Sequence, residues 1–282
     1  MNLWYSLVEL LPFEWAAPGG MYFMKNALLA VLVITPLFGI LSTMVVTNRM
    51  SFFSDALGHS AFTGISIGVL CGLADPMWCA VFFAVAFSAL FTVVRHKSNL
   101  DSDTVIGVFS STAVALGIFI ATLNSGSFTK FNSILIGDIL SVEPSKIFLL
   151  LFILLIIVAL WVSAFNELMI ASIHPALAGS RGIRVVWQEA VFSAAIAVVV
   201  TVSMTWVGLL VINSLLVLPA AAARNVARNM RQYHLFSILG ALVAGLAGLM
   251  TSYYAGASAG ASITLYLAVF FALTFFLRKK RI

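Results

Sequence analysis

The sequence has few charged residues: Asp, Glu, Lys and Arg make up 9% of its 282 residues, whereas 62% are hydrophobic. Soluble domains carry about 25% charged residues. This composition therefore excludes water as the main solvent of the chain. Within a bilayer only a helix bundle or a closed barrel satisfies the backbone polar groups. The apolar runs are continuous rather than alternating, so we predict an all-α, polytopic membrane helix bundle.

Several motifs of soluble enzymes are also missing. The only cysteines, Cys71 and Cys79, lie in or beside apolar runs, which excludes a disulfide framework and a cysteine metal site. No phosphate loop G-x-x-x-x-G-K-[ST] occurs; the nearest glycine-rich stretch, GASAGASIT at 256–264, lacks the Lys and is typical of helix packing. HExxH and a second His–Asp cluster are absent, which argues against a membrane-embedded metallohydrolase. We expect a chain that is not an enzyme and does not hydrolyse ATP itself.

Nine apolar segments have roughly the length that crosses about 30 Å of hydrocarbon. They lie near residues 24–47, 54–73, 76–95, 104–124, 146–164, 186–206, 207–224, 234–254 and 260–278. The seventh follows the sixth with almost no polar break, so eight or nine transmembrane helices are predicted. No domain boundary or repeat is visible, and residues 1–282 are expected to form a single transmembrane domain. Residues 1–20 read as an interfacial segment rather than a signal peptide.

The basic residues predict the orientation. Clusters follow the first, third, fifth, seventh and ninth segments, and by the positive-inside rule they mark the cytoplasmic side. The N-terminus is then outside and the C-terminus inside, although Lys25, Lys130 and Lys146 do not fit. If one segment is re-entrant, eight spans remain and the N-terminal orientation flips.

Two connections are longer than a tight turn. Residues 124–142, on the outer side, are expected to contain a short helix along the surface. Residues 165–189, on the inner side, mix apolar residues with Glu167 and end in a glycine-rich turn. An amphipathic helix parallel to the membrane would fit there and could dock into the groove of a partner. A plain interfacial helix without a partner is the alternative.

The stretch FFSDALGHSAFTGISIG at 52–68 places two ionisable groups in an apolar chain. At about 100° per residue, Asp55, His59, Thr63 and Ser66 share one stripe. The small residues Ser60, Gly64 and Gly68 lie on the opposite face and would let another helix approach closely. A carboxylate at the bilayer centre costs at least about 2.5–3.5 kcal/mol, so the polar stripe should face a hydrated path or a cation.

A carboxylate and an imidazole at i and i+4 form a plausible half-site for a first-row divalent ion. The same two side chains could instead form a hydrogen bond that packs two helices, or relay protons. The residues alone leave these three interpretations open.

The sequence resembles the permease subunits of the ABC-3 family of bacterial ATP-driven importers of zinc, manganese and iron. The stretch RMSFFSDALGHSAFTG matches the family pattern at Arg49, Met50, Ser51, Asp55, Ala56, His59 and Gly64. It departs from the pattern at Ser54, Gly58, Ser60 and Thr63, which weakens any inference about the metal. Residues 103–118, 134–142 and 207–224 are also similar to the family, in the same order.

The resemblance implies a permease without a permanently bound cofactor, in the bacterial cytoplasmic membrane, that passes the ion by alternating access. It implies three partners: a separate ATP-binding subunit, an extracytoplasmic metal-binding protein and a second copy of the permease, within membrane lipid and without nucleic acid. Asp55 and His59 match positions that line the metal path. The inner loop, residues 165–185, would then be the ATPase-coupling segment, with candidate contacts at Glu167, Leu168, Ala171, Gly179 and Gly182.

Three further residues are candidates for the pathway: Thr63, Asn213 and Asp138. Asn213 lies in the seventh segment before Pro219, where freed carbonyls could line a path or the helix could simply bend. Asp138 could guide cations or cap a turn. A secondary, proton-coupled transporter that uses Asp55 and His59 as a relay is the alternative function.

Overall fold

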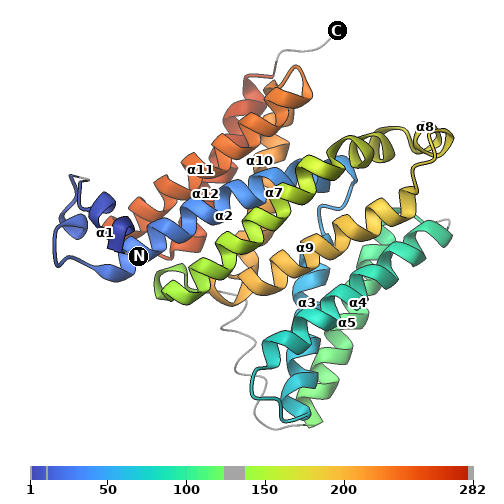
Figure 1. Cartoon of the computed structure of the whole chain (residues 1–282), viewed down its shortest axis with the longest axis horizontal. Coiled ribbons are helices and arrows are strands. Elements are labelled where there is room, and N and C mark those ends of the chain that lie inside the picture. The colour runs from blue at the N-terminus through green and yellow to red at the C-terminus, as the bar shows by residue number, and fades with distance from the viewer. Residues whose placement is uncertain (1, 11, 99, 124–136, 279–282) are drawn as a thin grey trace.

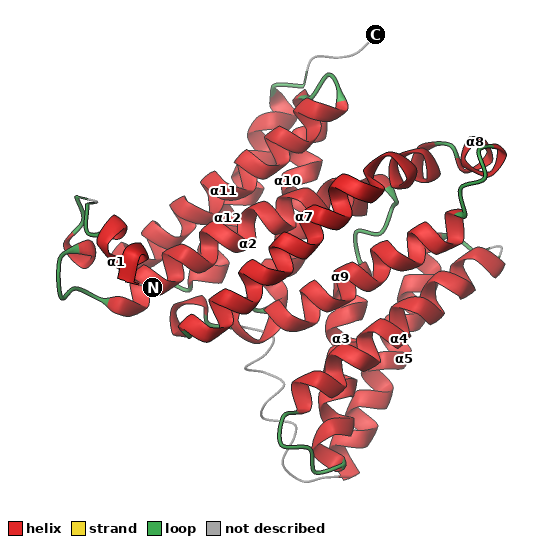
Figure 2. Cartoon of the chain, viewed as in Figure 1, coloured by secondary structure: helices red, strands yellow, loops and turns green. Residues whose placement is uncertain are grey.

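The computed structural model describes residues 2–10, 12–98, 100–123 and 137–278, and within these ranges it contains helices and no strand (Figure 2). All nine predicted segments are helices. They are α2 (Tyr22–Thr47), α3 (Phe53–Leu70), α4 (Pro76–Lys97), α5 (Ser102–Leu123), α7 (Pro144–Ile173), α9 (Val185–Val207), α10 (Leu209–Val226), α11 (Met230–Ala255) and α12 (Ala259–Phe276). The all-α prediction is therefore confirmed.

Eight of these nine helices are long and apolar enough to cross a membrane. The exception is α3, which has 18 residues but includes Asp55, His59 and several small residues that lower its hydropathy. The helix that departs from the apolar pattern is thus the one that carries the two ionisable groups.

The helices form two groups joined by α7 and α9 (Figure 1). In the first group α3 packs against α4 and α5; in the second, α2 packs against α10 and α11, and α12 packs against α10 and α11. Helix α9 contacts α4 on one side and α7 on the other, and α7 in turn contacts α2. Helix α3 also contacts α10, so the two groups meet between these helices.

A glycine separates the sixth and seventh segments, where the sequence shows almost no polar break. Helix α9 ends at Val207, and Gly208 has φ = 84°, ψ = 147° before α10 begins at Leu209. Residues with a Cβ rarely adopt this conformation. Space is also restricted, because a Cβ built on Gly137 would lie 2.1 Å from the Gly208 nitrogen. The seventh segment is therefore a helix of its own.

The N-terminal segment folds against the start of α2. It contains α1 (Asn2–Val8) and the 3-10 turn η1 (Glu14–Ala16). The Lys25 side chain is fully buried and lies 3.0 Å from Glu9 Oε1, and its Nζ also donates to the Ala17 carbonyl. Lys25 did not fit the positive-inside pattern because it is a neutralised, buried cation rather than a loop charge.

The inner connection differs from the prediction. Helix α7 does not end near residue 164. It spans 30 residues, from Pro144 to Ile173. The short helix α8 (Pro175–Ser180) follows and packs against α7. The helix expected within the connection 165–189 therefore corresponds to the last turns of α7 plus α8. On the outer side, most of the expected surface helix lies outside the described residues, and its described end is the 3-10 turn η2 (Ile139–Ser141).

Candidate functional site

Asp55 and His59 lie one turn apart near the start of α3. His59 Nε2 is 3.4 Å from Asp55 Oδ2, and the side chains are 19% and 43% exposed, respectively. Asp55 belongs to the first turn of the helix, where the positive end of the helix dipole favours a carboxylate. The two side chains are therefore within reach of each other, and both are partly exposed.

Asn213 on α10 completes this cluster. Its Nδ2 donates to Asp55 Oδ1 over 3.3 Å. Its Oδ1 is buried and has no hydrogen-bond partner among the described residues. The two positions were separate candidates in the sequence, and the fold brings them together.

An open pocket of about 640 Å³ lies beside Asp55 and Asn213. Its wall includes Ser214 and the N-terminal residues Ser258 and Gly260 of the α12 region. Thr264 on α12 donates to Ser214 Oγ over 3.1 Å. Hydroxyl, amide and carboxylate groups therefore share one cavity within a chain that is otherwise apolar.

Small residues bring α3 close to its neighbours, as predicted. A Cβ on Gly64 would lie 2.5 Å from the Ala80 Cα of α4, and one on Gly68 would lie 3.0 Å from the Pro76 Cα. A Cβ on Gly58 would meet the Leu209 side chain of α10 at 2.4 Å. These close approaches fix α3 against both groups of helices and hold Asp55 at the pocket.

Thr63 is placed elsewhere. It is fully buried, and its hydroxyl donates to the Ala113 carbonyl of α5 over 2.7 Å. Thr63 thus shares the stripe of Asp55 and His59 in sequence but faces α5 in the structure. Thr63 therefore ties α3 to α5 and is not among the residues that line this pocket; its place in the ion pathway stays a prediction.

Asp138 is exposed and caps the turn η2. Its Oδ1 accepts from the Leu140 backbone N over 3.0 Å, and its carbonyl accepts from Ser141 Oγ. This is the capping role that the sequence left open as an alternative. The pocket beside Asp55 is lined by other residues.

A family model described as the ABC 3 transport family matches residues 20–278 of the chain. The chain belongs to the ABC-3 family. The match covers every long helix of the structure and confirms the resemblance seen in the sequence.

Individual relatives of this ABC-3 protein agree. It is 30% identical over 261 residues to the manganese import system permease protein ScaB of Streptococcus parasanguinis, with 92% of each chain covered. It is 25% identical over 254 residues to the high-affinity zinc uptake system membrane protein ZnuB of Haemophilus influenzae, with 90% of this chain and 97% of the relative covered. Its fold is similar to the solved structure of PsaBC from Streptococcus pneumoniae in complex with Fab, with a TM-score of 0.79, 28% identity, and 100% and 98% coverage. Together with the apolar helices, these matches show a multi-pass membrane protein.

The five candidate coupling residues of the ABC-3 protein divide into two sets. Glu167, Gly179 and Gly182 are exposed. Leu168 and Ala171 are 7% and 8% exposed, because their i, i+3 spacing places them on the face of α7 that packs against the chain itself. Leu168 and Ala171 therefore pack inside the chain, and a contact of this segment with a partner stays a prediction.

An ion-pair network at the C-terminal end of α4 was not predicted. Arg95, at the end of α4, donates to Glu189 Oε1 of α9 over 2.6 Å, to Ser102 Oγ over 2.9 Å and to the Asn48 carbonyl over 2.8 Å. His96 also contacts Glu189. Sequence reasoning used Arg95 only for orientation, since nothing local pairs it with a Glu that lies 94 residues away. The network joins α2, α4, α5 and α9 at one level.

Proposed function

We propose that this chain is the membrane-spanning permease subunit of an ATP-driven importer of a divalent metal ion of the zinc, manganese and iron class. The observation that carries the proposal is the cluster of Asp55, His59 and Asn213 on two helices that are distant in sequence, in which Asp55 and Asn213 line an open pocket. The relatives named above, which are described as manganese and zinc permeases, support the choice of cargo.

The donor set suits a passing ion rather than a resident one. A carboxylate oxygen, an imidazole nitrogen and an amide oxygen are acceptable to zinc, manganese and iron. Among the described residues no group of three or more His, Cys, Asp or Glu side chains could hold a metal. A structural site normally supplies four strong ligands. A smaller set, completed by water, allows the ion to bind and then leave, as conduction requires.

The surface around α8 and the missing phosphate loop support a partner subunit that supplies the energy for transport. The chain has no phosphate loop, so ATP hydrolysis is assigned to a separate subunit. Large apolar side chains are exposed around α8, notably Ile173 at 47%, Leu177 at 45% and Trp187 at 65%. Together with Glu167 they form a surface with the composition of a docking site. An extracytoplasmic binding protein and a second copy of the chain complete the proposed importer.

Metal uptake by the complete importer in proteoliposomes tests the proposal. With ATP supplied on the side of the ATP-binding subunit, proteoliposomes with the wild-type protein should accumulate manganese, zinc or iron. Those with Asp55→Ala or His59→Ala should not. Asp101→Ala is the matched control, because Asp101 is an exposed acid remote in sequence from the cluster, and it should transport normally. Uptake driven by a pH gradient without ATP would instead establish the proton-coupled alternative. Normal uptake by both the Asp55 and His59 variants would refute the assignment of the ligands.

A further inference from the structure

A long groove runs along the outer surface of α11 and α12, away from the Asp55 pocket. It has a volume of about 620 Å³, and on α11 it follows Gln232, Phe236, Leu239, Gly240 and Val243. Their spacing of four, three, one and three residues places them on one face of the helix. Phe270, Thr274 and Leu277 of α12 form the other wall.

The groove has the length of one bilayer leaflet. Eleven residues separate Gln232 from Val243, which corresponds to about 16 Å of helix. Half of the hydrocarbon core is about 15 Å. Leu239, Val243 and Leu277 are 47%, 63% and 71% exposed, and both helices are membrane spans. The apolar part of the groove thus matches an acyl chain that lies between the membrane surface and the midplane.

The polar end of the groove carries a positively charged side chain, Arg228. Arg228 lines the groove and is exposed, and its backbone N donates to Gln232 Oε1 over 3.0 Å. No Asp or Glu follows Glu189 in the sequence, and no ion pair of Arg228 is present among the described residues. Within the described part of the chain, the Arg228 guanidinium therefore has no carboxylate that neutralises it.

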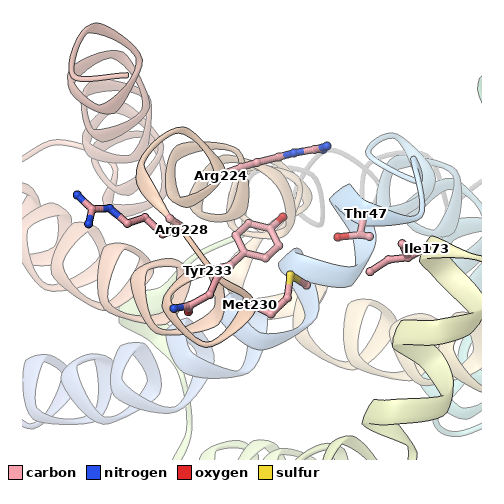
Figure 3. Close-up of a pocket in the computed structure, with 8 residues that line it drawn as sticks. Thr47, Ile173, Arg224, Arg228, Met230 and Tyr233 are labelled. Carbon is pink, nitrogen blue, oxygen red and sulfur yellow. The ribbon is translucent and has the colours of Figure 1, made fainter. Parts of the chain in front are cut away.

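A second pocket, of about 370 Å³, lies on the other side of the same turn, next to Arg224, Tyr233, Thr47 and Ile173. Figure 3 shows that the Arg224 side chain extends toward Thr47 and Ile173, whereas Arg228 extends the opposite way. Both arginines border this second pocket, but Arg224 does not line the groove of α11 and α12. Only Arg228 combines with the long apolar groove.

We propose that the groove between α11 and α12 binds an anionic phospholipid, with the phosphate at Arg228 and one acyl chain along Phe236, Leu239 and Val243. The charge and the length of the groove favour this occupant over a protein segment. A basic pocket between helices on the cytoplasmic side is suited to anionic head groups. The site does not depend on the identity of the transported metal.

Lipid binding to the purified full-length chain, measured by native mass spectrometry, tests the proposal. Phosphatidylglycerol should bind more tightly than phosphatidylcholine with the same acyl chains, and soluble glycerol phosphate should not compete. Arg228→Ala should weaken phosphatidylglycerol binding about fivefold, the effect of one basic side chain near an anionic surface. Arg231→Ala is the matched control, since Arg231 lies three residues further along the chain but does not line the groove, and it should bind normally.

A groove-filling variant tests the acyl-chain part separately. Val243→Trp places a large side chain in the groove at an exposed position, so it should fold and should lose phosphatidylglycerol and phosphatidylcholine alike. Val269→Trp, at an exposed position of α12 that does not line the groove, is its control and should retain both lipids. Equal loss in Arg228→Ala and Arg231→Ala, competition by glycerol phosphate, or normal binding by Val243→Trp would overturn the proposal.

Discussion

Asn213 donates a hydrogen bond to Asp55 over 3.3 Å, although 158 residues separate them in the sequence. The same carboxylate lies 3.4 Å from His59, so Asp55 connects a side chain of its own helix to one of α10. A change in the distance between α3 and α10 would alter the donor set around the pocket. This link makes the two helices the place where metal binding and helix movement are expected to be coupled.

Asn213→Ala should weaken metal uptake while leaving the fold intact. The substitution removes the donor that orients Asp55 and a nearby amide oxygen, and loss of such a supporting group typically costs about 10–100-fold in metal affinity or activity. The effect should appear as a raised KM for metal in proteoliposome uptake. Asn225→Ala is the control, because Asn225 lies on the same helix but bonds Thr274. Equal KM values for the two variants would contradict a role for Asn213 at the pocket.

Much of the fold could be predicted from the sequence. All nine apolar segments are helices, and the small face of α3 packs against α4 at Gly64 and Gly68 as predicted. These features depend on local composition and period, which a single sequence reveals. The end of α7 was predicted too early, near residue 164. The residues that follow include Glu167, but they are apolar enough for the helix to continue to Ile173.

The site could be predicted only in part. Asp55 and His59 are neighbours in one helical turn, so their pairing follows from spacing. The positions of Asn213 and Thr63 depend on which helices pack together, and helical period alone does not determine that. Thr63 shares the stripe of Asp55 but faces α5, whereas Asn213 comes from a segment whose separate existence depends on Gly208.

Gly64→Ala should destabilise the protein, whereas Gly107→Ala should not. A Cβ at position 64 would lie 2.5 Å from the Ala80 Cα, so the backbone of α3 or α4 must move, and such overpacking typically costs about 1–3 kcal/mol. Nothing lies within 4 Å of a Cβ at Gly107 on α5, where the change to Ala favours the helix. Thermal unfolding in detergent, monitored by size-exclusion chromatography, measures the stability of both variants. A Gly64 variant as stable as the Gly107 variant would show that the close packing of α3 and α4 is unimportant.

Glu9→Gln should loosen the N-terminal segment. Lys25 is 0% exposed and pairs with Glu9, and removal of one partner of a buried pair costs up to about 3–5 kcal/mol. The loss of stability should be at the lower end of this range, because the Glu9 side chain is 32% exposed. Limited proteolysis of residues 1–20 should become faster, and the double variant Glu9→Gln/Lys25→Met should restore protection. Glu14→Gln serves as the control. Unchanged proteolysis of Glu9→Gln would show that the ion pair does not hold the segment.

Glu167→Ala combined with Leu177→Ala should reduce co-purification with the ATP-binding subunit. Glu167 is exposed near the end of α7 and accepts a hydrogen bond from Gln188 of α9, and Leu177 on α8 is 45% exposed. The pair therefore combines a positioned charge with an apolar contact on one surface. Glu143→Ala, at the opposite end of α7, is the control and should co-purify normally. Leu168→Ala should also leave docking intact once corrected for protein yield, because Leu168 packs inside the chain. If the double variant retained the ATP-binding subunit at the wild-type level, the docking surface would lie elsewhere on the inner end.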